Sequence, residues 1–158
     1  MSQRISRRQM LRNTAMAGFG AWVAGSTSAS YGSLPSEKLN IACIGIGGRG
    51  RANLNSLANQ NIVALCDVDD SRAGNAYQKF DKAKKFYDFR KMLDAMHKDI
   101  DAVSVSTPDH AHFHPAIAAL QLGKHLYCEK PMAHSIEEVR IMTDLARKQK
   151  VATQLGVQ

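Results

Sequence analysis

The segment Gly45-Ile46-Gly47-Gly48-Arg49-Gly50 decides the fold because of what lies on each side of it. An apolar run at residues 39–44 precedes it, and a segment with helical spacing at residues 51–58 follows it. Between a strand and a helix, Gly45 permits a tight turn, Gly47 lets the backbone approach a pyrophosphate, and Gly50 lets the helix pack closely. The free amides at the start of the helix would then face the anion.

An acid in the right place supports this interpretation. Asp67 stands twenty residues after Gly47 and directly follows the apolar run 62–66, where a carboxylate can accept hydrogen bonds from both hydroxyls of an adenosine ribose. The same charge repels a 2′-phosphate, so NAD is favoured over NADP, although Arg49 and Arg72 could favour the phosphate. A glycine-rich turn without a ligand is the alternative. The residues predicted to bind the cofactor here are Gly45, Gly47, Gly48, Arg49, Gly50 and Asp67.

Apolar runs alternate with helical patterns along the rest of the chain. The predicted strands are residues 39–44, 62–66, 85–87, 102–105, 125–128 and 151–155, and the predicted helices are residues 51–58, 73–80, 89–96, 115–122 and 136–148. Ser135 and Glu138 have the spacing of a capping box at the start of the last helix. This alternation predicts one α/β domain over residues 38–158, a doubly wound parallel sheet with helices on both faces.

Two further motifs follow predicted strands. Ser106-Thr107-Pro108-Asp109-His110 comes after residues 102–105, and Glu129-Lys130-Pro131 comes after residues 125–128. Both lie at carboxyl ends of parallel strands, the edge where open α/β sheets bind ligands. With the glycine loop and residues 64–69, they resemble the N-terminal Rossmann domain of the Gfo/Idh/MocA oxidoreductases over about residues 38–158. As in those relatives, Pro131 is expected to follow a cis peptide bond.

The resemblance implies a chemistry and assigns residues to it. A nicotinamide cofactor would exchange hydride with carbons of a small carbohydrate-like substrate, a sugar or a cyclitol. Thr107 and Pro108 would line the cofactor, His112 would lie near it, and Glu129 would contact the nicotinamide ribose. Lys130 would belong to the cofactor site and would also be the catalytic residue, because its ammonium stabilises the alkoxide that develops on the substrate as hydride leaves.

Family members continue into a second domain that covers the nicotinamide and supplies a substrate pocket, whereas this sequence ends at Gln158. We therefore expect a truncated enzyme that lacks its substrate domain. The apolar face left uncovered would promote self-association. Three functions stay open: an NAD-dependent oxidoreductase, a glycoside hydrolase that uses tightly held NAD, and a non-catalytic nucleotide-binding module.

The first 30 residues have the pattern of an export signal. Basic residues come first, a weakly apolar stretch at residues 15–24 follows, and small residues occupy positions 25–30. Ser6-Arg7-Arg8 resembles a twin-arginine signature, which predicts a periplasmic or otherwise exported protein. The alternative is a general secretory signal or a disordered basic tail. Ten apolar residues are too few for a permanent membrane span. Residues 31–37, rich in Ser, Gly and Pro, form a predicted linker.

Charge and composition exclude other functions. The chain has 158 residues, 44% of them apolar, which is enough for one core. Its net charge of +7 comes largely from the first 30 residues, which hold four arginines and no acid. No basic run with interleaved aromatic residues follows, so we predict no nucleic-acid binding.

The cysteines and histidines predict no metal site. Cys43, Cys66 and Cys128 each lie inside an apolar run and lack a C-x-x-C spacing, so they are expected to be buried thiols. His110, His112 and His114 alternate, which would place them on one face of a strand. This stretch follows a proline and leads into a predicted helix instead. We therefore expect one cofactor-site histidine and two partly exposed neighbours.

Overall fold

The fold is known from a computed structural model that describes residues 38–157. The predicted signal at residues 1–30 and the predicted linker at residues 31–37 lie outside the described residues. In the part that is described, no helix is both long enough and apolar enough to span a bilayer.

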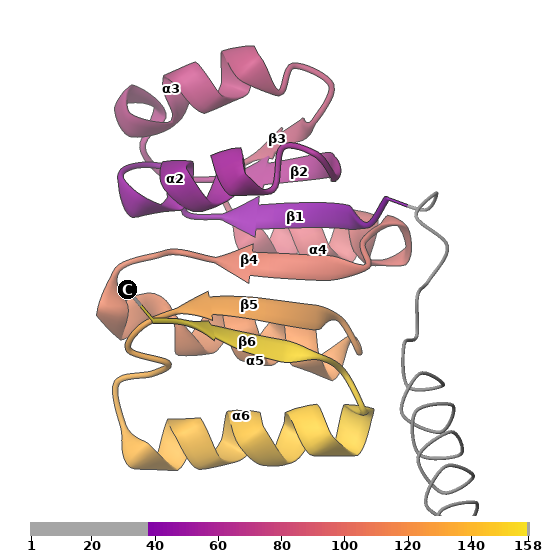
Figure 1. Ribbon diagram of the computed structural model, residues 1–158, viewed down its shortest axis with the longest axis vertical. Helices are drawn as coiled ribbons and strands as arrows, with labels where there is room; N and C mark the ends of the chain where they lie inside the picture. The colour runs from indigo at the N-terminus through magenta and orange to yellow at the C-terminus, as the bar shows by residue number, and fades with distance from the viewer. Residues whose placement is uncertain (1–37, 158) are drawn as a thin grey trace, which may run out of the picture. The chain divides into compact units, whose positions relative to one another are not determined.

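Six strands form one sheet in which every pair of neighbours is parallel. They are β1 (Asn40–Ile44), β2 (Asn61–Cys66), β3 (Lys84–Phe86), β4 (Ala102–Val105), β5 (His125–Glu129) and β6 (Thr153–Gly156). The order across the sheet is β3-β2-β1-β4-β5-β6 (Figure 1). The chain therefore winds outward from the centre in both directions, which confirms the predicted doubly wound α/β fold.

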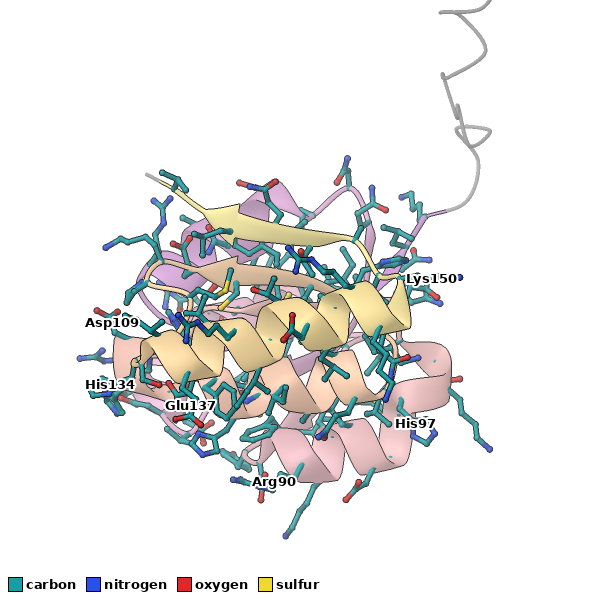
Figure 2. All side chains as sticks on the ribbon, turned by 90° about the horizontal axis from the view of Figure 1, so that it is seen from below. Arg90, His97, Asp109, His134, Glu137 and Lys150 are labelled. Carbon is teal, nitrogen blue, oxygen red and sulfur yellow. The ribbon has the colours of Figure 1, made fainter. Side chains whose placement is uncertain are left out.

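Helices cover both faces of the sheet. On one face lie α2 (Arg49–Ser56) and α3 (Asp70–Lys79); on the other lie α4 (Phe89–Met96), α5 (Phe113–Gln121) and α6 (Ile136–Gln149). Figure 2 shows α4, α5 and α6 side by side in one layer. Two short 3-10 turns, η1 (His97–Asp99) and η2 (Asp109–Ala111), connect helices and strands.

The central strand β1 shows why the sheet needs both layers. Ile41 and Cys43 pack in the core beneath α2 and α3, whereas Ala42 and Ile44 pack in the core beneath α4, α5 and α6. Successive side chains of a strand point to opposite faces, so a strand that is apolar throughout is stable only between two layers. Burial of one large aliphatic side chain contributes about 1.5–3 kcal/mol to folding.

The three cysteines are buried and unpaired, as the sequence predicts. Burial raises the pKa of the Cys43 thiol to about 12, and burial is also the main reason why the pKa values of Cys66 and Cys128 reach about 12. Each therefore stays a protonated thiol at neutral pH, a form that is neither nucleophilic nor metal-binding.

Three helices begin earlier than their apolar spacing predicts: α2 and α5 by two residues and α3 by three. Helix α2 starts at Arg49, inside the glycine motif, after Gly48 at its N-cap. Helix α3 starts at Asp70 because the side chain of Asp69 accepts hydrogen bonds from the amides of Ser71 and Arg72. Periodicity alone misses such caps.

Helix α6 begins where the sequence predicts, and the predicted capping box is present. The Ser135 hydroxyl accepts from the Glu138 amide at 3.2 Å, and the Glu138 carboxylate accepts from the Ser135 amide at 3.1 Å. The two side chains thus satisfy two amides that the helix leaves unpaired.

Candidate functional site

The glycine loop lies at the point where the strand order reverses. It follows β1, and the loop that follows β4 lies directly against it. Gly45 has φ +77°, and a Cβ atom there would lie 2.6 Å from the carbonyl oxygen of Ser106. A Cβ on Gly50 would collide with the carbonyl oxygen of Gly45. Only glycine fits at either position, in agreement with the tight turn and the close helix packing expected from the motif.

A cavity of about 730 Å³ opens between these two loops and the end of β2. That volume is within the usual range for small-molecule sites. Its lining comes from the carboxyl ends of four neighbouring strands and from the starts of α2, α3, α4 and α5. The lining residues are Ile44, Gly45, Gly47, Gly48, Arg49, Cys66, Asp67, Val68, Asp69, Arg72, Tyr87, Phe89, Arg90, Ser106, Thr107, Pro108, His110, Ala111, His114 and Pro115.

Asp67 supports the glycine loop as well as lining the cavity. The amides of Ile46 and Gly47 donate to its Oδ2 atom at 2.8 and 3.2 Å, and the amide of Asp69 donates to its Oδ1 atom at 3.1 Å. A carboxylate has about four acceptor positions, so these three contacts leave about one position, on Oδ1, for a ribose hydroxyl. Asp67, which the sequence predicts to bind the ribose, therefore also holds the glycine loop in shape.

Thr107 provides an independent test of whether a dinucleotide fits. Its hydroxyl Oγ1 is buried in the lining of the cavity and has no hydrogen-bond partner among the described residues. A buried hydroxyl without a partner costs about 1–3 kcal/mol unless a ligand or water satisfies it. Together with the arginines at positions 49, 72 and 90 of the lining, it suits a polar, anionic ligand. The site therefore fits the diphosphate and ribose groups of NAD.

His112 lies next to the cavity but does not line it. Its side chain is 1% exposed, with Nδ1 2.6 Å from the carbonyl oxygen of Pro131 and Nε2 2.7 Å from that of Thr107. Both ring nitrogens thus face backbone carbonyls, so the ring ties two loops together. His110 and His114, which are exposed, line the cavity instead. Within residues 38–157, no three His, Cys, Asp or Glu side chains gather as metal ligands would.

Glu129 is a buried carboxylate with several donors around it. Its Oε1 atom accepts hydrogen bonds from Asn53 at 2.8 Å and from Tyr127 at 3.0 Å, and Arg49 Nε lies 3.4 Å away. Burial acts to raise the pKa of this carboxyl, but the hydrogen bonds outweigh it and hold the pKa below its ordinary value. Glu129 therefore carries a negative charge at neutral pH.

Lys130 follows Glu129 at the same edge of the sheet, with an exposed side chain and a cis bond to Pro131, as expected. Neither Glu129 nor Lys130 lines the 730 Å³ cavity. Figure 2 places Asp109 and His134 at this same end of the molecule, toward which the strand arrows point, and His97 and Lys150 at the opposite end.

Two members of the Glu129 cluster were missed by sequence reasoning. Asn53 occupies a buried position of α2 beside Leu54, and Tyr127 lies within β5 two residues before Glu129. The sequence signal for Asn53 was its place four positions after Arg49 on the same helix. The signal for Tyr127 was its place on the same strand face as Glu129. Neither signal shows that the residue bonds to Glu129, and Asn53 lies 76 residues before Glu129 along the chain.

Several known proteins are similar to this chain in sequence. Glucose-6-phosphate 3-dehydrogenase from Bacillus subtilis (strain 168) is 34% identical over 119 residues, which cover 73% of this chain and 33% of that protein. A glycosyl hydrolase family 109 protein from Solibacter usitatus (strain Ellin6076) is 33% identical over 152 residues, covering 85% of this chain and 35% of that protein.

Solved structures are similar to this chain as well. Scyllo-inositol dehydrogenase from Lactobacillus casei, with bound cofactor NAD(H) and scyllo-inositol, matches with a TM-score of 0.68 at 26% identity over 76% of this chain and 36% of that one. The chain spans about a third of the length of these relatives. A family model described as "Oxidoreductase family, NAD-binding Rossmann fold" matches residues 39–157. The chain therefore belongs to this GFO_IDH_MocA family, and NAD is the cofactor of its fold.

Proposed function

We propose that residues 38–158 are the NAD-binding part of an oxidoreductase that moves hydride between the cofactor and a hydroxyl-bearing carbon of a sugar or cyclitol. The observation that carries this proposal is the cavity at the switch point, where the glycine loop, Asp67 and the unpartnered Thr107 hydroxyl meet. Relatives named as dehydrogenases of glucose 6-phosphate and scyllo-inositol support the substrate class.

In this proposal, NAD supplies the hydride acceptor and the chain's own residues bind and orient it. Asp67 accepts from a ribose hydroxyl, and the amides at the start of α2 donate to the diphosphate. The ammonium of Lys130 stabilises the negative charge that develops on the substrate oxygen. The substrate hydroxyl would lose its proton to solvent and its carbon would lose a hydride to the bound cofactor, which would oxidise the substrate to a carbonyl compound.

The first experiment is calorimetric titration of NAD and NADP into the full 158-residue chain. We expect saturable NAD binding that weakens by about tenfold or more in Asp67→Ala, because a charge-assisted contact to the ribose and the support of the glycine loop are both lost. Asp94→Ala is the matched control, since Asp94 is an exposed acid of α4 outside the cavity. The absence of NAD binding in the wild-type chain would refute the proposal.

Turnover is tested separately with glucose 6-phosphate and inositols by following NADH formation. Lys130→Ala should abolish any activity of the wild-type chain while NAD binding persists. NAD binding without turnover on any such substrate, in the wild type and in Lys130→Ala alike, would instead favour the non-catalytic nucleotide-binding module.

An NAD-dependent glycoside hydrolase is the second candidate. It is supported by the similarity to the family 109 protein, which extends over 85% of the chain and thus further than the described domain. The two enzymes separate by product: the oxidoreductase accumulates NADH with a free sugar, and the hydrolase cleaves a glycoside with no net change in NADH.

We also propose that residues 1–30 direct export through the twin-arginine route. The support is the paired arginines before an apolar stretch. A fusion of residues 1–37 to a reporter that functions only after export should be active, and Arg7→Lys with Arg8→Lys should block it. Export that persists in this double variant would contradict the proposed route.

Self-association through an exposed apolar face stays a prediction. Large apolar side chains are exposed within the described residues, among them Ile136 at 73% and Val157 at 79%. Light scattering of the full chain tests the prediction, and a monodisperse monomer would contradict it.

A further inference from the structure

A buried polar cluster joins the helix of the glycine loop to the end of β5. Its centre is the Glu129 carboxylate, which is only 5% exposed. Asn53 of α2 donates from its side-chain amide to Glu129 Oε1 at 2.8 Å and to Ser106 Oγ at 2.9 Å. Tyr127 donates its hydroxyl to the same Glu129 oxygen at 3.0 Å. One helix side chain thereby connects the loop that follows β4 to the end of β5.

The cluster is closed on its far side by β6. A Cβ atom on Gly156 would lie 2.5 Å from the Tyr127 hydroxyl and 2.8 Å from Glu129 Oε2. The absence of a side chain at this position is what leaves room for the carboxylate and the phenol. The position of Glu129 is therefore constrained from α2, from β5 and from β6.

Arg49 connects this cluster to the cavity. Its Nε atom lies 3.4 Å from Glu129 Oε1, and its side chain, 52% exposed, is also part of the cavity lining. A guanidinium is planar with its donors in a fixed fork, so a contact at Nε sets the direction of the two terminal nitrogens. Arg49 is also the first residue of α2, next to the loop expected to hold a diphosphate.

We propose that Glu129, Asn53 and Tyr127 are positioning residues that hold the Arg49 guanidinium against the diphosphate of NAD. The inference rests on the proposed function, because it takes the cavity as the NAD site. A fork held in place by an anion loses less conformational freedom on binding than a free arginine, so the phosphate contact becomes stronger. The low pKa of Glu129, which burial opposes and the hydrogen bonds produce, keeps the anchor charged at neutral pH.

The test measures the affinities of NAD, ADP and adenosine for the full chain by calorimetry. Arg49→Ala should weaken NAD and ADP by about tenfold, because one charge-assisted hydrogen bond is lost, and leave adenosine unchanged. Asn53→Leu should weaken the same two ligands by about three- to tenfold through Arg49. The double variant should bind as Arg49→Ala does, since the two residues act through one contact.

Two further variants separate positioning from general stability. Asn55→Leu is the matched control, because Asn55 is an exposed asparagine of the same helix that bonds to Lys79 outside the cluster; it should change no affinity. Tyr127→Phe removes one donor and keeps the ring, so it should weaken NAD and ADP even if Asn53→Leu does not fold. If Asn53 and Tyr127 had only a structural role, their variants would weaken the binding of adenosine and ADP alike, or would leave all affinities unchanged below the melting temperature.

The outcomes distinguish the inference from the proposed function. If the wild-type chain binds none of the three ligands, the proposed function fails and the inference fails with it. If the wild-type chain binds NAD but the effects of Arg49→Ala and Asn53→Leu add, or adenosine weakens equally with ADP, only the positioning role is wrong.

Discussion

His112 Nδ1 lies 2.6 Å from the carbonyl oxygen of Pro131 and thereby joins the segment after β4 to the loop after β5. The other ring nitrogen lies 2.7 Å from the carbonyl of Thr107 in the lining of the cavity. The histidine that the sequence predicts near the cofactor therefore acts on the site through the backbone that it holds.

Replacing this ring tests that role. His112→Phe keeps most of the volume and removes both nitrogens, so it should lower the free energy of unfolding by about 1–3 kcal/mol, the usual cost of leaving a buried carbonyl unsatisfied. NAD affinity, measured by calorimetry, should also fall because the loop that contains Thr107 loses its contact with the His112 ring. His97→Phe is the control: His97 contacts one carbonyl, that of Leu93, at the opposite end of the sheet (Figure 2). An equal loss of NAD affinity in both variants would contradict the assignment.

Two glycine-to-alanine substitutions should have effects of opposite sign. Gly45→Ala places a Cβ 2.6 Å from a carbonyl oxygen at φ +77°, so we expect a loss of about 2 kcal/mol or more. Gly74→Ala, inside α3 with no atom within 4 Å of its added Cβ, should raise the free energy of unfolding by about 0.5–1 kcal/mol. Urea unfolding measures both changes, and destabilisation by Gly74→Ala would contradict an open space beside position 74.

The charge of Glu129 should make stability depend on pH in acid. Burial acts to raise the pKa of Glu129, but the hydrogen bonds to its carboxylate lower the pKa by more. The folded pKa therefore lies below the ordinary glutamate value of the unfolded chain. The contribution of Glu129 to the free energy of unfolding is therefore fully present above the unfolded pKa and is lost as pH falls through the folded pKa. Urea unfolding over a series of acid pH values should show a steeper loss for the wild type than for Glu129→Gln. Parallel curves would contradict an ionised Glu129.

Cofactor choice should depend on the charge at position 67. The Asp67 carboxylate repels a 2′-phosphate, so we expect the wild-type chain to bind NAD at least about tenfold more tightly than NADP. Asp67→Ser removes the charge and retains a small acceptor, which should lower this ratio mainly by weakening NAD and relieving the repulsion of NADP. Calorimetry with both cofactors measures the ratio, and an unchanged ratio would assign the discrimination to Arg72 or another residue of the lining.

The candidate site divides into residues that local pattern reveals and residues that it does not. Gly45, Gly47, Gly48, Arg49 and Asp67 were predicted from their places after apolar strands, and Thr107 from the family resemblance. All six line the cavity, whereas Gly50, which was also predicted, does not. Lys130 was found at the expected edge but is exposed within the described domain. Asn53 was not predicted, because a polar residue on a short helix normally marks the solvent face.

The amino-acid sequence by itself determined the order of strands and helices, the doubly wound class and the edge where ligands are expected to bind. It did so because periodicity, glycine turns and caps are local, and because parallel strands bring their carboxyl ends to one edge. Only the tertiary structure decided that Asn53 meets Glu129, 76 residues away, and that His112 bridges two loops. Those contacts depend on strand order, register and the volume that Gly156 leaves open, which no local pattern encodes.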